Sequence, residues 1–227
     1  MEKERSKRFT RFKKLYHYIF GEKFYKKLDF KWNQYPNRYQ VIQDTINRKS
    51  YKIYLEIGCF QDELFSKIKI ETKIGVDPVS GGTIRDTSDN FFKKNNIKFD
   101  IIFIDGLHEY DQVKKDINNS LLFLNNNGVI FLHDCMPTSY LHQAVPRATG
   151  VWNGDVWKNI VELRTKPEID TYVVCADQGI GMILKRPNKQ LLKLNITNFK
   201  KLKFRDFFYN YKKYLNIVYH QNLINIF

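Results

Sequence analysis

The sequence has few of the residues that would indicate a disulfide scaffold, a zinc ribbon or a membrane span. Its 227 residues include three cysteines, Cys59, Cys135 and Cys175, which cannot all pair and form no Cys-x-x-Cys. The apolar runs are short and interrupted by charges, and none approaches the roughly 20 residues that a membrane-spanning helix needs. No apolar stretch follows residues 1–5, so we expect a cytoplasmic protein without a signal peptide.

Acidic residues are scarce at the two ends of the chain. The sequence has 38 Lys and Arg residues against 24 Asp and Glu residues, a formal charge of +14. Residues 1–29 hold ten basic and four acidic residues, and residues 185–227 hold ten and one, which leaves residues 30–184 at −1. A basic surface attracts phosphate groups of nucleic acids, anionic lipids or nucleotide-linked metabolites.

Aromatic residues alternate with the basic ones at both ends. They are Phe9, Phe12, Tyr16, Tyr18, Phe20, Phe24 and Tyr25 at the front, and Phe199, Phe204, Phe207, Phe208, Tyr209, Tyr211 and Tyr214 at the back. The simpler explanation is two amphipathic helices that pack their aromatic side chains on the core and leave their lysines in water. The other explanation is a surface that binds the phosphate groups of nucleic acid, anionic lipid or a nucleotide-linked metabolite.

Strand-like and helical segments alternate through the middle of the chain. The predicted strands span residues 51–57, 73–76, 99–104, 128–132, 171–176 and 180–184, with a short further segment at 82–85. Asp177-Gln178-Gly179 joins the last two as a hairpin turn. This alternation predicts a mostly parallel α/β sheet to which the hairpin adds an antiparallel edge strand.

Helices are predicted between the strands. A short one spans 61–67, a second is capped by Ser88-Asp89, and a third spans 110–124 with its apolar residues at helical spacing. The third is expected to end at the Asn-Asn-Asn-Gly sequence of residues 125–128. We expect one compact domain, made of a basic helical extension over 1–49, a core over 50–185 and a basic aromatic helical extension over 186–227.

Every predicted strand of the parallel sheet is followed by an acidic residue. In an open α/β sheet, ligands bind at the edge where these strand ends meet the loops. The acids are Glu56, Asp77, Asp86, Asp89, Asp105 and Asp134, with His108 and His133 beside two of them. Polar loops are expected at any such edge, but an acid after every strand indicates a functional site.

The first loop of the core lacks the Gly-x-Gly-x-x-Gly fingerprint of dinucleotide-binding proteins. Gly58 nevertheless allows the backbone to approach a ligand closely, and Asp77, about twenty residues later, can accept hydrogen bonds from both hydroxyls of a ribose. These features favour an adenosine-type ligand without a pyrophosphate at the first loop. A simple tight turn at Gly58 and a turn before Pro78 are the alternative explanations.

Three segments resemble the first, second and fourth motifs of class I S-adenosylmethionine-dependent methyltransferases. They are Tyr54–Gly58, Gly75–Asp77 and Phe99–Asp105. Residues 87–92, 104–110 and 128–134 more specifically resemble a bacterial subgroup of O-methyltransferases of sugar and antibiotic biosynthesis. The resemblance covers about residues 50–185 and implies a Rossmann-like sheet of seven strands with helices on both faces. Asp62 departs from it, because the family has a second glycine there. Either the loop is wider, or Asp62 contacts the amino group of the methionine part.

The resemblance also implies a role for each residue of the motifs. Glu56 and Gly58 would face the amino-acid part of the cofactor, with Cys59 beside them, and Asp77 would bind the ribose. Thr87, Ser88 and Asp89 would lie near the adenine. Asp105 would lie near the sulfonium end. Packing is the simpler explanation for the side chains of Cys59 and Cys135, and Cys175 lies in a predicted strand of the core.

Methyl transfer to a hydroxyl requires the acceptor, the methyl group and the sulfur to be held in line, and the acceptor must lose a proton. A histidine base or a divalent cation can promote this loss. In metal-using relatives the positions of Asp105, His133 and Asp134 hold Mg²⁺, so these three are the predicted metal ligands. His133 fits Mn²⁺, Fe²⁺ or Zn²⁺ better than Mg²⁺, or it serves as the base. His108 is the other base candidate, unless it only bonds Asp134 or the backbone.

The segment 143–157 follows the fifth strand and has no strong periodicity, as an acceptor-binding insertion would. Its candidate acceptor-binding residues are Arg147, Trp152, Asn153, Asp155 and Trp157. Tryptophan can stack on a sugar ring, and the polar side chains can bond its hydroxyls. The alternative is that both tryptophans anchor the loop to the core.

The leading hypothesis is O-methylation of a hydroxyl on a sugar, either nucleotide-linked or part of a surface glycan, in bacterial capsule or polysaccharide biosynthesis. The basic ends would then meet a diphosphate or the inner face of an anionic membrane. The charge also suggests an RNA or DNA methyltransferase, but residues 104–108 lack the Asn/Asp-Pro-Pro-aromatic loop of enzymes that methylate base amino groups. A non-catalytic binding module with a methyltransferase-like fold is the third hypothesis. The sequence leaves the oligomeric state open, a homo-oligomer included.

Overall fold

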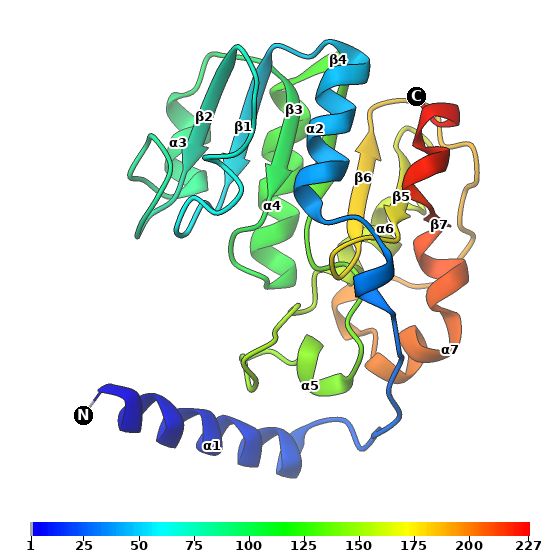
Figure 1. The fold of residues 1–227 in the computed structure, drawn as a ribbon. Coiled ribbons are helices and arrows are strands. Elements are labelled where there is room, and N and C mark those ends of the chain that lie inside the picture. Colours follow the sequence, from blue (N-terminus) through cyan, green and yellow to red (C-terminus); the bar gives the residue numbers. More distant parts are fainter. Residues whose placement is uncertain (1) are drawn as a thin grey trace.

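Within residues 2–227, which the computed structural model describes, the chain forms one sheet of seven strands. The strands are β1 Ile53–Ile57, β2 Thr72–Val76, β3 Phe99–Ile104, β4 Leu124–Leu132, β5 Asp170–Val174, β6 Ile180–Leu184 and β7 Ile217–Val218. Their order in the sheet is β2-β1-β3-β4-β6-β5-β7 (Figure 1). The predicted seven-stranded α/β class is confirmed.

The direction of the strands differs from the prediction at one place. Strands β2, β1, β3 and β4 pair in parallel, and β6 is antiparallel to both β4 and β5. The antiparallel strand therefore lies inside the sheet. The β5–β6 hairpin places β6 beside β4, so that β5 lies further out in the sheet. The short β7 pairs in parallel with β5 and forms the edge.

Two predicted local structures are wrong. Residues 61–67 form turns instead of a helix, because Phe60 and Asp62 take left-handed backbone conformations. The Asn-rich segment at 125–127 continues β4, since the Asn125 side chain donates to Asp100 and the Asn127 carbonyl accepts from Tyr51. The predicted short segment at 82–85 contributes a single bridge, between Val76 and Ile84.

Helices cover both faces of the sheet (Figure 1). They are α1 Glu2–Phe20, α2 Arg38–Lys49, α3 Ser88–Lys94, α4 Tyr110–Leu122, α5 Tyr140–Gln143, α6 Trp157–Leu163 and α7 Phe204–Leu215, with short 3-10 turns at Trp32–Gln34, Phe199–Lys201 and His220–Asn225. Thr87 caps α3, one residue before the predicted cap. No helix of residues 2–227 is long and apolar enough to cross a membrane.

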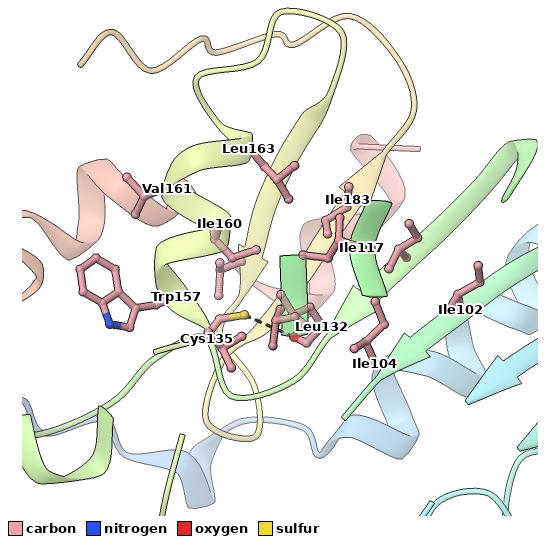
Figure 2. Packing of buried hydrophobic residues seen from close by; sticks show 14 of the residues in the cluster. Ile102, Ile104, Ile117, Leu132, Cys135, Trp157, Ile160, Val161, Leu163 and Ile183 are labelled. Atoms are coloured by element: carbon pink, nitrogen blue, oxygen red, sulfur yellow. Dashed lines mark hydrogen bonds between the residues drawn. The ribbon is translucent and has the colours of Figure 1, made fainter. Parts of the chain in front are cut away.

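Each face of the sheet has its own hydrophobic core. One core combines β-strand residues with side chains of α3, α4, α6 and α7, including Ile102, Ile117, Trp157 and Ile160 (Figure 2). The other places Val41, Ile42 and Ile46 of α2 on the opposite face. Burial of this much apolar surface holds the carboxyl ends of the parallel strands at one fixed edge.

The two basic ends behave differently. Phe204 and Phe207 of α7 are fully buried, as predicted for a helix that packs its aromatic residues on the core. Phe24 joins them, with its ring 6.0 Å from that of Phe204. Along α1, in contrast, Phe12 and Phe20 stay exposed, so the packing explanation is wrong for the first helix.

Candidate active site

A cavity of about 650 Å³ opens at the carboxyl ends of β1, β2 and β3. Its wall brings together most of the predicted cofactor-binding residues, namely Gly58, Asp77, Thr87, Ser88, Asp89 and Asp105. These residues come from separate loops, and the parallel strands bring them to one edge.

Gly58 makes the closest backbone approach in this wall. Its φ is +86°, a conformation that side chains with a Cβ rarely adopt, and a Cβ would lie 2.3 Å from the Asp105 carbonyl oxygen. The Asp105 amide donates to the Ile57 carbonyl at 2.8 Å, so the loops after β1 and β3 are bonded together here. The glycine is therefore required by both the turn and the close approach.

The Asp77 carboxylate joins the loops after β1 and β2. One oxygen accepts from the amides of Cys59 and Phe60, both at 3.0 Å, and the other accepts from Val79 and Ser80 at 2.7 and 2.9 Å. Burial would raise the pKa of Asp77, but the four N–H donors lower it below its usual value. All four acceptor positions of the carboxylate are thus occupied by backbone groups.

Asp62 takes a left-handed backbone conformation of the kind that glycine adopts readily. Its φ is +60°, and aspartate tolerates this region better than most residues. Its carboxylate accepts a hydrogen bond from the Gly82 amide at 2.6 Å. The departure from the family motif is therefore accommodated inside the loop.

The far end of the cavity contains a polar group that the sequence did not single out. Asp116 and Gln112 of α4 lie one helical turn apart and line the cavity beside Ser88. The Ser88 hydroxyl donates to Asp116 at 2.6 Å, and the Gln112 amide donates to Asp116 and Asp89, each at 3.1 Å. Burial raises the pKa of Asp116 to about 6. The four-residue spacing was the only available signal in the sequence.

Glu56 and Cys59 lie beneath the cavity and not in its wall. Glu56 is 2% exposed and accepts from the Tyr54 hydroxyl at 2.5 Å. The Cys59 thiol is buried, and a Cβ on Gly75 or Gly82 would meet its sulfur. Cys59 therefore packs the loop with its side chain and contributes its backbone amide to Asp77.

Glu56 makes the stability of the protein dependent on pH. Burial raises its pKa from 4.5 to about 8, so the folded protein favours the neutral carboxyl group. Its contribution to stability is complete below the unfolded pKa and is lost as the pH rises toward 8. We expect Glu56→Gln to be more stable than the wild type by about 2–4 kcal/mol at pH 9 and little changed at pH 4. Urea unfolding at both pH values measures this, and an equal difference at both would contradict it.

An acid and histidine group adjoins the cavity at Asp105. One ligand atom from each of Asp105, His108 and Asp134 lies within 4.8 Å of the others. His108 Nε2 lies 3.2 Å from Asp105 Oδ1, and its Nδ1 lies 3.1 Å from Asp134 Oδ2. His133 is adjacent, with Nδ1 3.2 Å from Asp105 Oδ1. The strand-end residues that the sequence predicted to converge are in contact.

The two histidines and Asp105 shift one another's protonation. Burial would lower the pKa of His133, but Asp105 and Asp134 raise it well above its usual value. The same two carboxylates raise the pKa of His108 against the effect of burial. Burial would raise the pKa of Asp105, and the neighbouring histidines lower it instead. The group is thus a set of mutually neutralising charges.

Three further residues complete this group and were missed by the sequence analysis. Arg38, at the start of α2, donates to Asp105 at 3.0 Å and lies 3.6 Å from Asp177. Asp177 and Gln178 come from the β5–β6 turn, where both have positive φ. Gln178 accepts from Asn153 at 3.3 Å. Arg38 is distant in sequence from every strand end, so no motif could indicate it.

In segment 143–157, two of the predicted acceptor-binding residues lie beside His108. The Trp152 ring stacks on His108 at 5.3 Å, with the Arg147 guanidinium 5.7 Å from its centre. The Asn153 amide donates to Asp134 at 2.7 Å, although the residue itself is buried. Trp152 and Arg147 therefore remain candidates for acceptor contact, and Asn153 positions the acidic group.

Asp155 and Trp157 lie elsewhere than predicted. The Asp155 carboxylate accepts from the Tyr110 amide at 2.7 Å and pairs with Lys158 at 3.2 Å, inside the protein. Trp157 is 0% exposed and lies in the core (Figure 2). The centre of its ring is 4.8 Å from that of Phe207. Both residues anchor the loop, which corrects their assignment to the acceptor site.

Residues 68–135 match the family of methyltransferase domains. No curated protein matches this chain by sequence. Among solved structures, cofactor-bound Rv0187 from MTB is similar with a TM-score of 0.51 and 11% identity, over 66% of this chain and 80% of that one. The SAH-bound methyltransferase PaMTH1 of Podospora anserina has a TM-score of 0.49 and 20% identity, over 66% and 78%. MycE from the mycinamycin pathway, in complex with Mg and SAH, has a TM-score of 0.44 and 13% identity, over 69% of this chain and 50% of that one.

The family match lies within the predicted core and includes β2, β3 and most of β4. The likeness to Rv0187 agrees with the Rossmann-like fold that the sequence motifs implied. The family match indicates a methyltransferase domain at residues 68–135, and the likeness to Rv0187 shows the fold.

Proposed function

We propose that this protein transfers a methyl group from S-adenosylmethionine to a hydroxyl group of a small or medium-sized acceptor. A sugar, nucleotide-linked or part of a surface glycan, is the acceptor class that we favour. The observation that carries the proposal is the position of Asp105, which belongs both to the cavity wall and to the acid and histidine group. A ligand in the cavity thus ends beside groups that can act on a hydroxyl.

The cavity fits a nucleoside with an amino-acid extension. Gly58 leaves room for close approach to the backbone, and Phe60, Val79 and Leu107 offer exposed apolar side chains along the wall. Ser88 and the Asp116 carboxyl group present polar atoms that suit the edge of an adenine. When bound, S-adenosylmethionine supplies an activated methyl group on its sulfonium.

Asp77 then has two roles in the proposal. Its backbone bonds fix the loops after β1 and β2, and its carboxylate is the candidate acceptor for the ribose hydroxyls. Because four N–H groups already bond it, the ribose would share these oxygens or displace the amides of Val79 and Ser80. Removal of this carboxylate therefore affects both loop stability and cofactor affinity.

The chain's own residues can orient and deprotonate the acceptor. His108, in its neutral form, is the better candidate for the base, because it is partly exposed whereas His133 is buried. Asp134 and the Trp152 ring hold the imidazole of His108 in place. Holding the hydroxyl near His108 and in line with the methyl group accounts for much of the rate enhancement that such a site can give.

The acid and histidine group also fits a divalent cation. Asp105, His108 and Asp134 would provide two carboxylates and one imidazole, a donor set that suits Mn²⁺ and its neighbours better than Mg²⁺. This candidate ligand set contains His108 in place of the predicted His133. His133 nevertheless lies close by, with its Nδ1 3.2 Å from Asp105 Oδ1. A bound cation would polarise the acceptor hydroxyl and lower its pKa.

Chelation separates the two ways of losing the proton. We expect EDTA to lower turnover at least a hundredfold, and Mn²⁺ or Mg²⁺ to restore it, because a site cation does the polarising. The measurement is transfer of a labelled methyl group before and after chelation, with cofactor binding as the control. Full activity in EDTA would contradict the metal site and leave His108 as a metal-free base.

The acceptor class is tested with the same transfer measurement on a panel. Nucleotide sugars and short glycans should accept the label, since Trp152 and Arg147 offer a ring face and a cation beside His108. A single-stranded RNA of mixed sequence is the comparison. Label in RNA and none in the sugars would favour a nucleic-acid methyltransferase instead.

A further inference from the structure

The first helix carries an apolar stripe that the protein leaves uncovered. Helix α1 extends away from the rest of the chain (Figure 1). The exposed side chains of the stripe are Phe12, Leu15, Tyr16, Ile19 and Phe20. Their spacing of three and four residues places them on one side of the helix. Phe12 is 70% exposed and Phe20 is 73% exposed, so the stripe is open to contact.

The opposite side of α1 is fixed to the loop that follows α5. His17 is buried, its Nδ1 lies 3.0 Å from the Tyr140 hydroxyl, and its Nε2 lies 2.7 Å from the Pro146 carbonyl oxygen. Tyr140 begins α5, which follows the carboxyl end of β4. The helix is therefore held by this contact on the active-site side of the protein.

A largely apolar cavity of about 560 Å³ lies between α1 and α5. Leu15, Phe24, Tyr25 and Leu141 contribute apolar surface to it. Lys14, Lys26 and Lys27 line the same cavity, and all three are exposed. Apolar surface next to ammonium groups is the combination that acyl chains and phosphate headgroups require.

We propose that α1 and residues 21–27 dock this protein on an anionic phospholipid bilayer, a function that does not depend on the proposed methyl transfer. The stripe would enter the interface, and the lysines would contact lipid phosphates. The local charge supports this occupant, since residues 1–29 hold ten basic residues and four acidic ones. Glu22 lines the same cavity, and its carboxylate accepts hydrogen bonds from the amides of Phe204 and Arg205.

Two other occupants fit the surface less well. Double-stranded nucleic acid is bound mainly through phosphate contacts of basic residues, which would leave Phe12, Ile19 and Phe20 uncovered. A second copy would bring two strongly basic ends together, and this repulsion opposes self-association. Phe204 and Phe207 of α7 are buried, so these two rings take no part in the surface.

The test is co-sedimentation of the full chain with vesicles of phosphatidylglycerol and phosphatidylcholine in equal parts, and with pure phosphatidylcholine. We expect binding to the anionic vesicles only, weakened by added salt. Phe12→Ser combined with Phe20→Ser should weaken binding about a hundredfold, from the loss of two inserted rings. Lys14→Gln should weaken it about fivefold. Leu122→Ser, at a residue 70% exposed at the end of α4, is the matched control and should bind as the wild type does.

Thermal unfolding shows whether each variant is folded. We expect every variant to fold, because all the substituted side chains are exposed. Equal binding by the double variant, or equal binding to neutral vesicles, would overturn the proposal. So would the absence of binding to any vesicle. Light scattering measures the oligomeric state of the wild type and of the double variant. A wild-type dimer that the double substitution disrupts, in a protein that binds no vesicles, would assign the stripe to a second copy instead.

Discussion

Asp134→Asn is expected to lower kcat for methyl transfer by about a hundredfold to a thousandfold, while the affinity for S-adenosylhomocysteine changes less than about twofold. Asp134 lies 3.1 Å from His108 Nδ1 and is not part of the cofactor cavity wall. Removal of its charge would release the imidazole from its orientation and weaken any cation bound with Asp105. Both effects act on the acceptor proton and not on cofactor binding.

Asparagine is the substitution of choice because Asp134 has a φ of +63°, which asparagine tolerates. The Asn153 amide, which donates to Asp134 at 2.7 Å, can still donate to the new side-chain oxygen. Asp111→Asn, at an exposed carboxylate of α4, is the matched control and should leave kcat unchanged. An Asp134→Asn enzyme with wild-type kcat would remove the acid and histidine group from the mechanism.

Gly58→Ala is expected to lower the affinity for S-adenosylhomocysteine by at least about a hundredfold. The new Cβ would lie 2.3 Å from the Asp105 carbonyl oxygen, at a residue whose φ is +86°. The loops after β1 and β3 would have to separate, and both form the cofactor cavity wall. Calorimetric titration measures the loss, and thermal unfolding measures the accompanying destabilisation of about 1–3 kcal/mol.

Gly106→Ala is the matched control for this substitution. Gly106 lies in the same wall, but a Cβ there would meet nothing nearer than the Ile57 side chain at 3.6 Å. We expect its affinity to stay within about threefold of the wild type. Wild-type affinity in a folded Gly58→Ala protein would show that the ligand does not depend on this close approach.

The convergence of the strand-end acids could be predicted because it follows from topology alone. Parallel strands present their carboxyl ends at one edge, so Asp77, Asp105 and Asp134 had to lie along the same edge once the strands were assigned. The strands themselves were clear, since 99–104 and 180–184 are mostly apolar segments rich in isoleucine, with the same bounds in the structure. The motifs then indicated which loops form the cavity.

The remaining features depend on contacts between distant segments. Arg38 reaches Asp105 only because α2 packs on the sheet and begins above this edge. Asp177 joins the group because β6 inserts next to β4, an arrangement that no local pattern specifies. For α1 the sequence showed an amphipathic pattern but not whether the protein itself would cover the apolar side.

Calorimetric titration of the purified protein with S-adenosylhomocysteine tests the central claim most directly. The cavity between Gly58, Asp77 and Asp105 predicts saturable binding at one site, without any acceptor or metal present. Gly58→Ala in the same instrument should show little or no heat. Absence of binding by wild-type protein whose thermal transition shows that it is folded would contradict the assignment of this cavity to the methyl donor.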